Sequence, residues 1–311
     1  MDIFFSLIPN LIPLYILIAL GYIGGKYMDV HLHSMAIIAI YFISPFVVFG
    51  AISQLDLNPA YLLLPLILFG IALMIIILSY RLSGLIFKDN LQNLIGLSSG
   101  NGNTGYYGLP VVLALFGPDV VGIYLLANFG AELCSITAGY YLGARSSADV
   151  KGSLLRVLKL PVVHAVWMGL LWNMTAPELP PLFYDWWTKA TGAWVIIGMM
   201  LIGVALSQIG KFRINIALMS WLFCVRFIVW PLAMIAFIFA DRLFLHLFDE
   251  TVYALLLVIG VVPLAGNVVA YAATLNVRPG EAATVVLAST LFALFYIPLM
   301  FYLMKSLILI P

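Results

Sequence analysis

Long apolar runs, separated by short polar breaks, dominate the chain. Most runs reach about 20 residues, the length that an α-helix needs to cross a bilayer. The breaks divide the chain into predicted membrane spans with the approximate ranges 3–25, 34–53, 61–87, 91–117, 120–144, 154–174, 185–209, 214–240, 250–276 and 281–303. The pattern therefore predicts an all-α, polytopic membrane protein with ten transmembrane helices.

The fourth predicted span contains residues that interrupt a helix. Its centre holds Gly100, Asn101, Gly102, Asn103, Gly105, Gly108 and Pro110. Inside a helix, each Gly costs about 1 kcal/mol and each Pro about 3 kcal/mol relative to Ala. Backbone groups freed at membrane depth are tolerated only where they are buried in protein or line a watery cavity. This break therefore predicts a binding site.

Basic residues concentrate in alternate loops. If the N-terminus lies outside, ten Lys and Arg residues fall in inner loops and three in outer segments. Cytoplasmic loops of membrane proteins carry such an excess of basic residues. We therefore expect a multi-pass protein of the cell membrane with both termini extracytoplasmic.

The polar segment 145–153 divides the predicted spans into five and five. Residues 1–144 would form a first five-helix repeat, residues 145–153 a cytoplasmic linker, and residues 154–311 a second repeat. Because the two halves enter the membrane from opposite sides, they would be inverted repeats. The ninth span, as partner of the fourth, should then also be broken. It carries Pro263, Gly266 and Asn267.

Several short motifs occur together in a characteristic order and spacing. They are Gly21-Tyr22, Asn103-Thr104-Gly105 followed by Gly108-Leu109-Pro110, Gly203-Val204-Ala205-Leu206, Arg226 with Pro231, Pro263 with Asn267, and Ser289-Thr290 followed by Ile297-Pro298-Leu299. In these motifs the chain resembles the auxin efflux carrier family, which includes plant PIN-type carriers and bacterial organic-acid permeases. The short midpoint segment and the surroundings of Asn267 are more similar to the bacterial branch.

This resemblance implies a fold and a function. Ten helices would form two inverted five-helix repeats, with broken helices four and nine crossing, in a fold related to that of bile acid:sodium symporters. Helices one, two, six and seven would form a scaffold, against which the other helices move in an elevator-like, alternating-access cycle. The implied substrate is a small organic anion such as malate or malonate, and the implied assembly is a homodimer.

Polar residues at the two breaks are the predicted substrate site. The N-termini of half-helices carry partial positive charge and free N–H groups, which suit a carboxylate. Neutral donors and an aromatic wall would complete the site: Asn101, Asn103, Thr104, Tyr107 and Asn267. Such a site would hold an anion without a fixed cation in lipid. The alternative is that these residues only cap the interrupted helices.

Two charged residues, Glu132 and Arg226, lie about 12 residues inside predicted spans, which is roughly 18 Å of helix. Charges inside the membrane mark functional sites by default. Glu132 would bind a coupling proton or be a neutral or paired structural group, and Asn128 lies one helical turn before it. Arg226 would pair with Glu132, attract the substrate or contact backbone carbonyls. Uniport, proton coupling and sodium coupling all stay open.

Composition and motifs exclude other classes of protein. The net charge is +1 without a basic run, so nucleic-acid binding is not expected. Cys134 and Cys224 lie in apolar stretches, and we expect no disulfide, metal or cofactor. His31, His33 and His246 fall in predicted loops and are interpreted as solvated. Motifs of intramembrane proteases are absent, so an enzyme is only a remote alternative.

Overall fold

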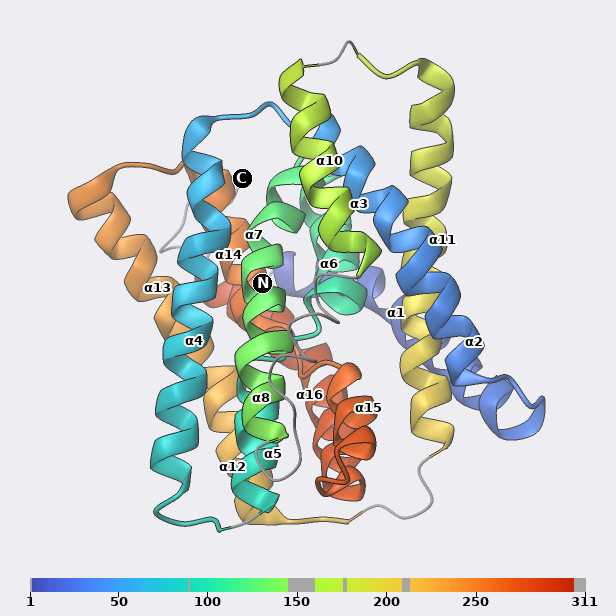
Figure 1. The fold of residues 1–311 in the computed structure, drawn as a ribbon, viewed down its shortest axis with the longest axis vertical. Coiled ribbons are helices and arrows are strands. Elements are labelled where there is room, and N and C mark those ends of the chain that lie inside the picture. Colours follow the sequence, from blue (N-terminus) through green and yellow to red (C-terminus); the bar gives the residue numbers. More distant parts are fainter. Residues whose placement is uncertain (1, 89, 145–159, 176–177, 209–212, 305–311) are drawn as a thin grey trace.

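The computed structural model describes residues 2–88, 90–144, 160–175, 178–208 and 213–304. Within these residues every regular element is helical (Figure 1). The fold class predicted from the apolar runs is therefore confirmed as all-α. The predicted linker, residues 145–153, lies outside the described residues.

The first half of the chain is a series of helices, several of which continue into one another through single π-helical turns. Its elements are α1 (Asp2–Tyr27), α2 (Leu32–Ile37), η1 (Ile38–Ile43), α3 (Ser44–Ser53), the 3₁₀ turn η2 (Pro59–Leu63), α4 (Leu64–Ser83), α5 (Asn90–Ser99), η3 (Thr104–Gly108), α6 (Leu109–Phe116), α7 (Val121–Cys134), η4 (Ser135–Gly139) and α8 (Tyr140–Gly143).

The second half has the same character. Its elements are α10 (Pro161–Thr175), α11 (Pro181–Ser207), α12 (Ile216–Cys224), η5 (Val225–Val229), α13 (Trp230–Ala240), η6 (Asp241–Leu245), α14 (Glu250–Val261), α15 (Asn267–Thr274) and α16 (Pro279–Met304). Each π-helical turn marks a place where the regular hydrogen-bond ladder is locally widened, a feature that is frequent at functional sites.

Six helices of the described part are long and apolar enough to cross a bilayer. They are Leu32–Ser53, Pro59–Ser83, Val121–Gly143, Pro181–Ser207, Ile216–Leu245 and Pro279–Leu303. Each coincides with one of the predicted spans. The other four predicted spans hold α1, the pair α5 and α6, α10, and the pair α14 and α15. The chain is thus a multi-pass membrane protein.

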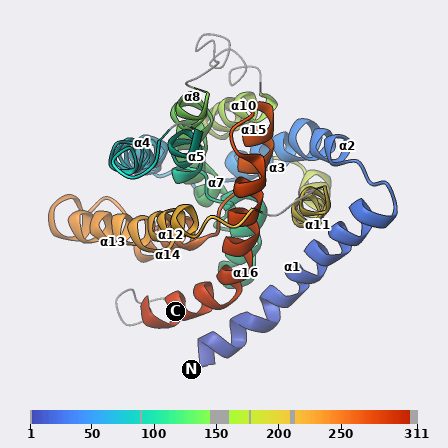
Figure 2. The ribbon, with the colours of Figure 1, turned by 90° about the horizontal axis from the view of Figure 1, so that it is seen from below.

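The helices form two groups with a central region between them. In Figure 2, α1 and α11 lie on one side, α4, α12 and α13 lie on the other, and α15 and α16 lie between them. Helix α1 packs along α11, and their backbones approach closely where Gly203 faces Ile18. A Cβ atom at Gly203 would lie 1.9 Å from the Ile18 carbonyl oxygen, so only glycine permits this contact.

Helix α14 is the most deeply buried element near the site. All its residues from Val252 to Val261 are buried, because their side chains are apolar on every face. This burial places the end of α14, and therefore the second break, inside the protein.

Candidate functional site

The two interrupted helices meet through their backbones. Between α5 and α6 the chain leaves the helix at Gly100, and between α14 and α15 it leaves the helix at Val262. The Asn103 N–H donates to the Pro263 carbonyl at 2.7 Å, and the Ala265 N–H donates to the Asn101 carbonyl at 3.0 Å. These two bonds form an isolated antiparallel bridge, which we call the junction (residues 100–103 and 262–266). Backbone groups freed by each break are thus paired with the other break.

The C-terminal end of α5 is capped by three side chains. Trp230 Nε1 donates to the Ser99 carbonyl at 2.8 Å, and Ser135 Oγ donates to the Gly100 carbonyl at 2.8 Å. Asn101 Nδ2 donates back to the Leu97 carbonyl at 2.7 Å. The last carbonyls of a helix have no partner within it, so these bonds supply what the break removes. The Asn101 side-chain amide is therefore engaged in capping α5, and its contact with substrate stays a prediction.

Arg226 caps the C-terminal end of α14. Its guanidinium is buried and donates to the carbonyls of Ile259 and Val262. It also lies 4.9 Å from the centre of the Trp230 ring. A Cβ atom at Gly102 would lie 2.7 Å from the guanidinium carbon, so the absence of a side chain there makes room for Arg226. A cation at a helix C-terminus is also favoured by the helix dipole.

One donor at the junction has no partner. Asn103 is 3% exposed, and its Nδ2 has no hydrogen-bond partner among the described residues. An unsatisfied buried polar group costs about 1–3 kcal/mol, and such groups in native proteins call for an explanation. A neutral donor without a partner suits an anionic or carbonyl ligand.

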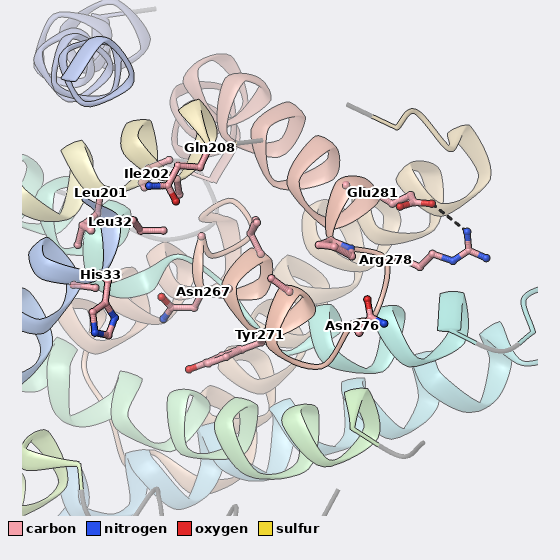
Figure 3. Close-up of a pocket in the computed structure, with 18 of the residues that line it drawn as sticks. Leu32, His33, Leu201, Ile202, Gln208, Asn267, Tyr271, Asn276, Arg278 and Glu281 are labelled. Carbon is pink, nitrogen blue, oxygen red and sulfur yellow. Dashed lines mark hydrogen bonds and ion pairs between the residues drawn. The ribbon is translucent and has the colours of Figure 1, made fainter. Parts of the chain in front are cut away.

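A large cavity begins beside the junction. Its volume is about 1190 Å³. One wall comes from α2, η1 and α11, and the other from α15 and the start of α16 (Figure 3). Asn267, the first residue of α15, lines this cavity together with Gly266 before it. Gly266, the residue before α15, has no side chain that could cap this helix. The N–H groups of Val268 and Val269 donate to the Ala265 and Gly266 carbonyls.

Basic side chains outnumber acidic ones around this cavity. His31, His33, Arg213 and Arg278 contribute to its lining. Glu281 is the acidic residue of the lining, and it forms an ion pair with Arg278 at 3.3 Å. The sequence predicted a loop at His33, but the structure places this residue in α2. The surplus of basic groups makes the cavity electrostatically suited to anions.

Of the two neighbouring tyrosines in the first break, only one borders the large cavity. Tyr106 lines it, and its ring contacts Trp194 edge-on at a centroid distance of 6.3 Å. Tyr107, the predicted aromatic wall, is fully buried and does not line it. Its hydroxyl lies 2.8 Å from that of Tyr15, which in turn donates to the Thr290 carbonyl at 2.7 Å.

The remaining predicted site residues gather at a second, much smaller cavity of about 10 Å³. Thr104, Asn128, Glu132 and Arg226 all contribute to its lining, with glycines of the first break. Glu132 and Arg226 form no direct ion pair within the described residues, whose ion pairs are Arg242–Glu250 and Arg278–Glu281.

The residues predicted to break the helices occupy distinct places, and three of them lie within a helix. Gly105 and Gly108 lie in the π-helical turn η3, and Pro110 lies in the first turn of α6. Because η3 and α6 form one continuous helix, Thr104–Phe116, the missing N–H of Pro110 removes a hydrogen bond inside this helix, directly after the widened turn. Pro263 lies in the second break, where its carbonyl accepts from Asn103.

Comparison with known proteins identifies the class to which this fold and junction belong. The family described as "Membrane transport protein" matches the chain twice, over residues 6–151 and 145–301. The chain therefore belongs to this family of membrane transporters, and the resemblance to auxin efflux carriers is confirmed. An uncharacterised transporter of Methanocaldococcus jannaschii is 28% identical over 230 residues, which cover 70% of this chain and 74% of the relative.

Proposed function

We propose that this membrane transporter is a secondary carrier of small organic anions, and that the anion binds between the junction and the large cavity. The single observation that supports this most is the buried, unpartnered amide of Asn103 at the point where the two breaks meet. The N-terminus of α15, the Asn267 side chain and the basic lining of the cavity point to the same ligand chemistry.

The neutral character of this site fits the work of a carrier. Arg226, the buried cation at the junction, donates its hydrogen bonds to the carbonyls of Ile259 and Val262. An anion would therefore be held by amide and backbone donors. Such binding is weaker than binding to a buried, unpaired cation, and release on the other side of the membrane is correspondingly easier.

The proposed architecture has ten spans in two inverted five-helix repeats, with the interrupted helices crossing at the junction. The twofold match of the family to the two halves supports a repeat. The proposed cycle moves α15, α16 and the junction against α1, α2 and α11 in an elevator-like manner. Both termini would be extracytoplasmic in the cell membrane. The homodimer stays a prediction from the resemblance.

Transport by the purified protein in proteoliposomes tests this function. Vesicles loaded with unlabelled malate, malonate, succinate or acetate would be diluted into the same labelled compound, alongside a neutral sugar and an amine. We expect exchange of at least one of the organic anions and of neither the sugar nor the amine. Exchange of the amine or sugar alone, or of none of the compounds, would contradict an anion carrier of this kind.

A further inference from the structure

Glu132 lies in the middle of a membrane helix, at a structurally distinctive place. It is in α7, three residues before the π-helical turn η4, which begins at Ser135. Ser135 caps the Gly100 carbonyl of the first break. A carboxyl group at this depth is a functional-site hypothesis by default. Through Ser135, one turn further along the helix, Glu132 is also close to the backbone of the junction.

The charge of an ionised Glu132 would have no direct partner in the described part of the chain. The cation that shares the small cavity, Arg226, directs its donors to the carbonyls of Ile259 and Val262. Glu132 is half-buried within a membrane helix, and withdrawing an unpaired carboxylate from water is so costly that such a group takes up a proton instead. The surroundings of Glu132 thus favour the neutral carboxyl.

Asn128 gives a second, independent reason. It lies one helical turn before Glu132, and residues four apart are neighbours on a helix surface. Asn128 is 8% exposed, and its amide oxygen has no hydrogen-bond partner among the described residues. A carboxylate only accepts hydrogen bonds, whereas a carboxylic acid also donates one. A proton on Glu132 would therefore supply the donor that Asn128 lacks.

The small cavity between these residues allows the bond to be direct or bridged. Its volume of about 10 Å³ is at the lower limit for a single water. One water would be sufficient to carry the hydrogen bond from Glu132 to Asn128. The same water-sized space touches Gly102 and Thr104. A change in the protonation of Glu132 would therefore change the surroundings of the first break.

We propose that Glu132 is a proton-binding site, and that one proton taken up there accompanies each transported anion; this rests on the proposed carrier function. A negative charge on Glu132 would repel an anion at the junction, and protonation removes that charge. Proton binding and anion binding therefore favour each other, and by linkage each raises the affinity for the other. The coupled movement of both ions is symport.

Other ionisable groups near Glu132 do not provide the same response. Tyr106 of η3, Tyr124 of α7, Tyr271 of α15 and Arg226 of η5 surround it. Tyrosine and arginine side chains do not ordinarily change charge near neutral pH. Glu132 is thus the member of this cluster on which a proton gradient would act.

Uptake of labelled malate into proteoliposomes tests the proposal, with the membrane potential clamped by potassium and valinomycin. An imposed gradient, acidic on the side of malate, should raise the initial rate of wild type several-fold. Glu132→Gln, which mimics the protonated group, should still exchange malate but lose the response to the gradient. His164→Gln, on the exposed face of α10, is the control and should retain the response.

Two results would overturn the proposal. One is a wild type that exchanges anions but ignores the proton gradient, and the other is a Glu132→Gln variant that responds like wild type. Absence of any anion exchange by wild type would overturn the carrier function as well, which separates the two failures. Thermal unfolding in detergent provides a second readout. Glu132→Gln should unfold at the wild-type temperature; a marked decrease would show that the fold depends on an ionised Glu132 and would contradict the neutral carboxyl proposed here.

Discussion

The sequence position of Arg226 is compatible with several roles, whereas its contacts in the structure show one. Its position in an apolar span fits an ion pair to Glu132, attraction of substrate or contact with carbonyls. The contacts show the third role, at the end of α14. The sequence could not distinguish these roles, because the acceptors lie 33 and 36 residues away along the chain.

The first prediction concerns this cap. Arg226→Lys keeps the charge but removes the planar fork that reaches both carbonyls. Hydrogen bonds that involve a charged group contribute about 1.5–3 kcal/mol. We therefore expect the variant to lose that much unfolding free energy, as measured by chemical or thermal unfolding in detergent micelles. Full stability together with loss of anion binding would assign Arg226 to the substrate instead.

A second prediction concerns the wall of the large cavity. A Cβ atom at Gly198 of α11 would lie 2.1 Å from a ring carbon of Tyr106. Gly198→Ala must therefore displace this ring, and overpacking of this kind costs about 1–3 kcal/mol. We expect lower stability and slower anion exchange, measured on the same preparation.

Gly192→Ala is the matched control, because it is on the same helix. No atom lies within 4 Å of a Cβ at that position. Equal effects of the two substitutions would show that the ring of Tyr106 is not the cause.

At the scale of elements, a chain of hydroxyl groups joins helices from distant parts of the sequence. Tyr15 of α1 hydrogen-bonds to Tyr107 of η3 and donates to the Thr290 carbonyl of α16. In the proposed cycle, α1 belongs to the scaffold while η3 and α16 move. These two bonds would therefore hold the conformation described here and break during transport.

The third prediction follows from that arrangement. Tyr15→Phe removes both bonds, whereas Tyr107→Phe leaves the bond from Tyr15 to Thr290. Hydrogen bonds between membrane helices contribute about 0.6 kcal/mol on average. We expect Tyr15→Phe to destabilise the protein about twice as much as Tyr107→Phe, measured by unfolding in bicelles. Equal losses would show that the bond to Thr290 contributes nothing.

The position of each break could be predicted, but their contacts could not. Glycine and proline act on the local backbone, so Gly100, Gly102 and Pro263–Gly266 indicated the interruptions directly, whereas Gly105, Gly108 and Pro110 lie inside the helix Thr104–Phe116. The caps from Trp230 and Ser135, and the bond from Tyr15, depend on tertiary packing, which leaves no local signal in the sequence. His33 was missed for the same reason, since only the fold places α2 opposite α15.

At the scale of the whole molecule, the lining of the large cavity predicts the side of the membrane to which the cavity opens. Its lining includes Arg213 and Arg278, and both belong to loops predicted to face the cytoplasm. The conformation described here would then be open to the inside. The cavity lies between α11 and α15, the two walls that the proposed cycle moves past each other.

The fourth prediction tests this direction. Ala205→Cys places a thiol on the cavity wall. The background should be Cys224→Ser, because Cys224 is exposed, while Cys134 is buried. A membrane-impermeant maleimide should label the introduced thiol in inside-out vesicles and not in intact cells, and a transported anion should slow the labelling. Labelling from outside alone would reverse the predicted orientation.

The central claim is that the anion binds between the junction and the large cavity, and equilibrium binding of labelled malate to the detergent-solubilised protein tests it most directly. Asn267→Asp is nearly isosteric but adds a negative charge at the start of α15, and Asn103→Ala removes the unpartnered donor. The variants should bind malate at least about tenfold more weakly, which corresponds to about 1.4 kcal/mol. His164→Gln, on the exposed face of α10, should bind it like wild type. Wild-type affinity in both the Asn103 and the Asn267 variant would contradict the account.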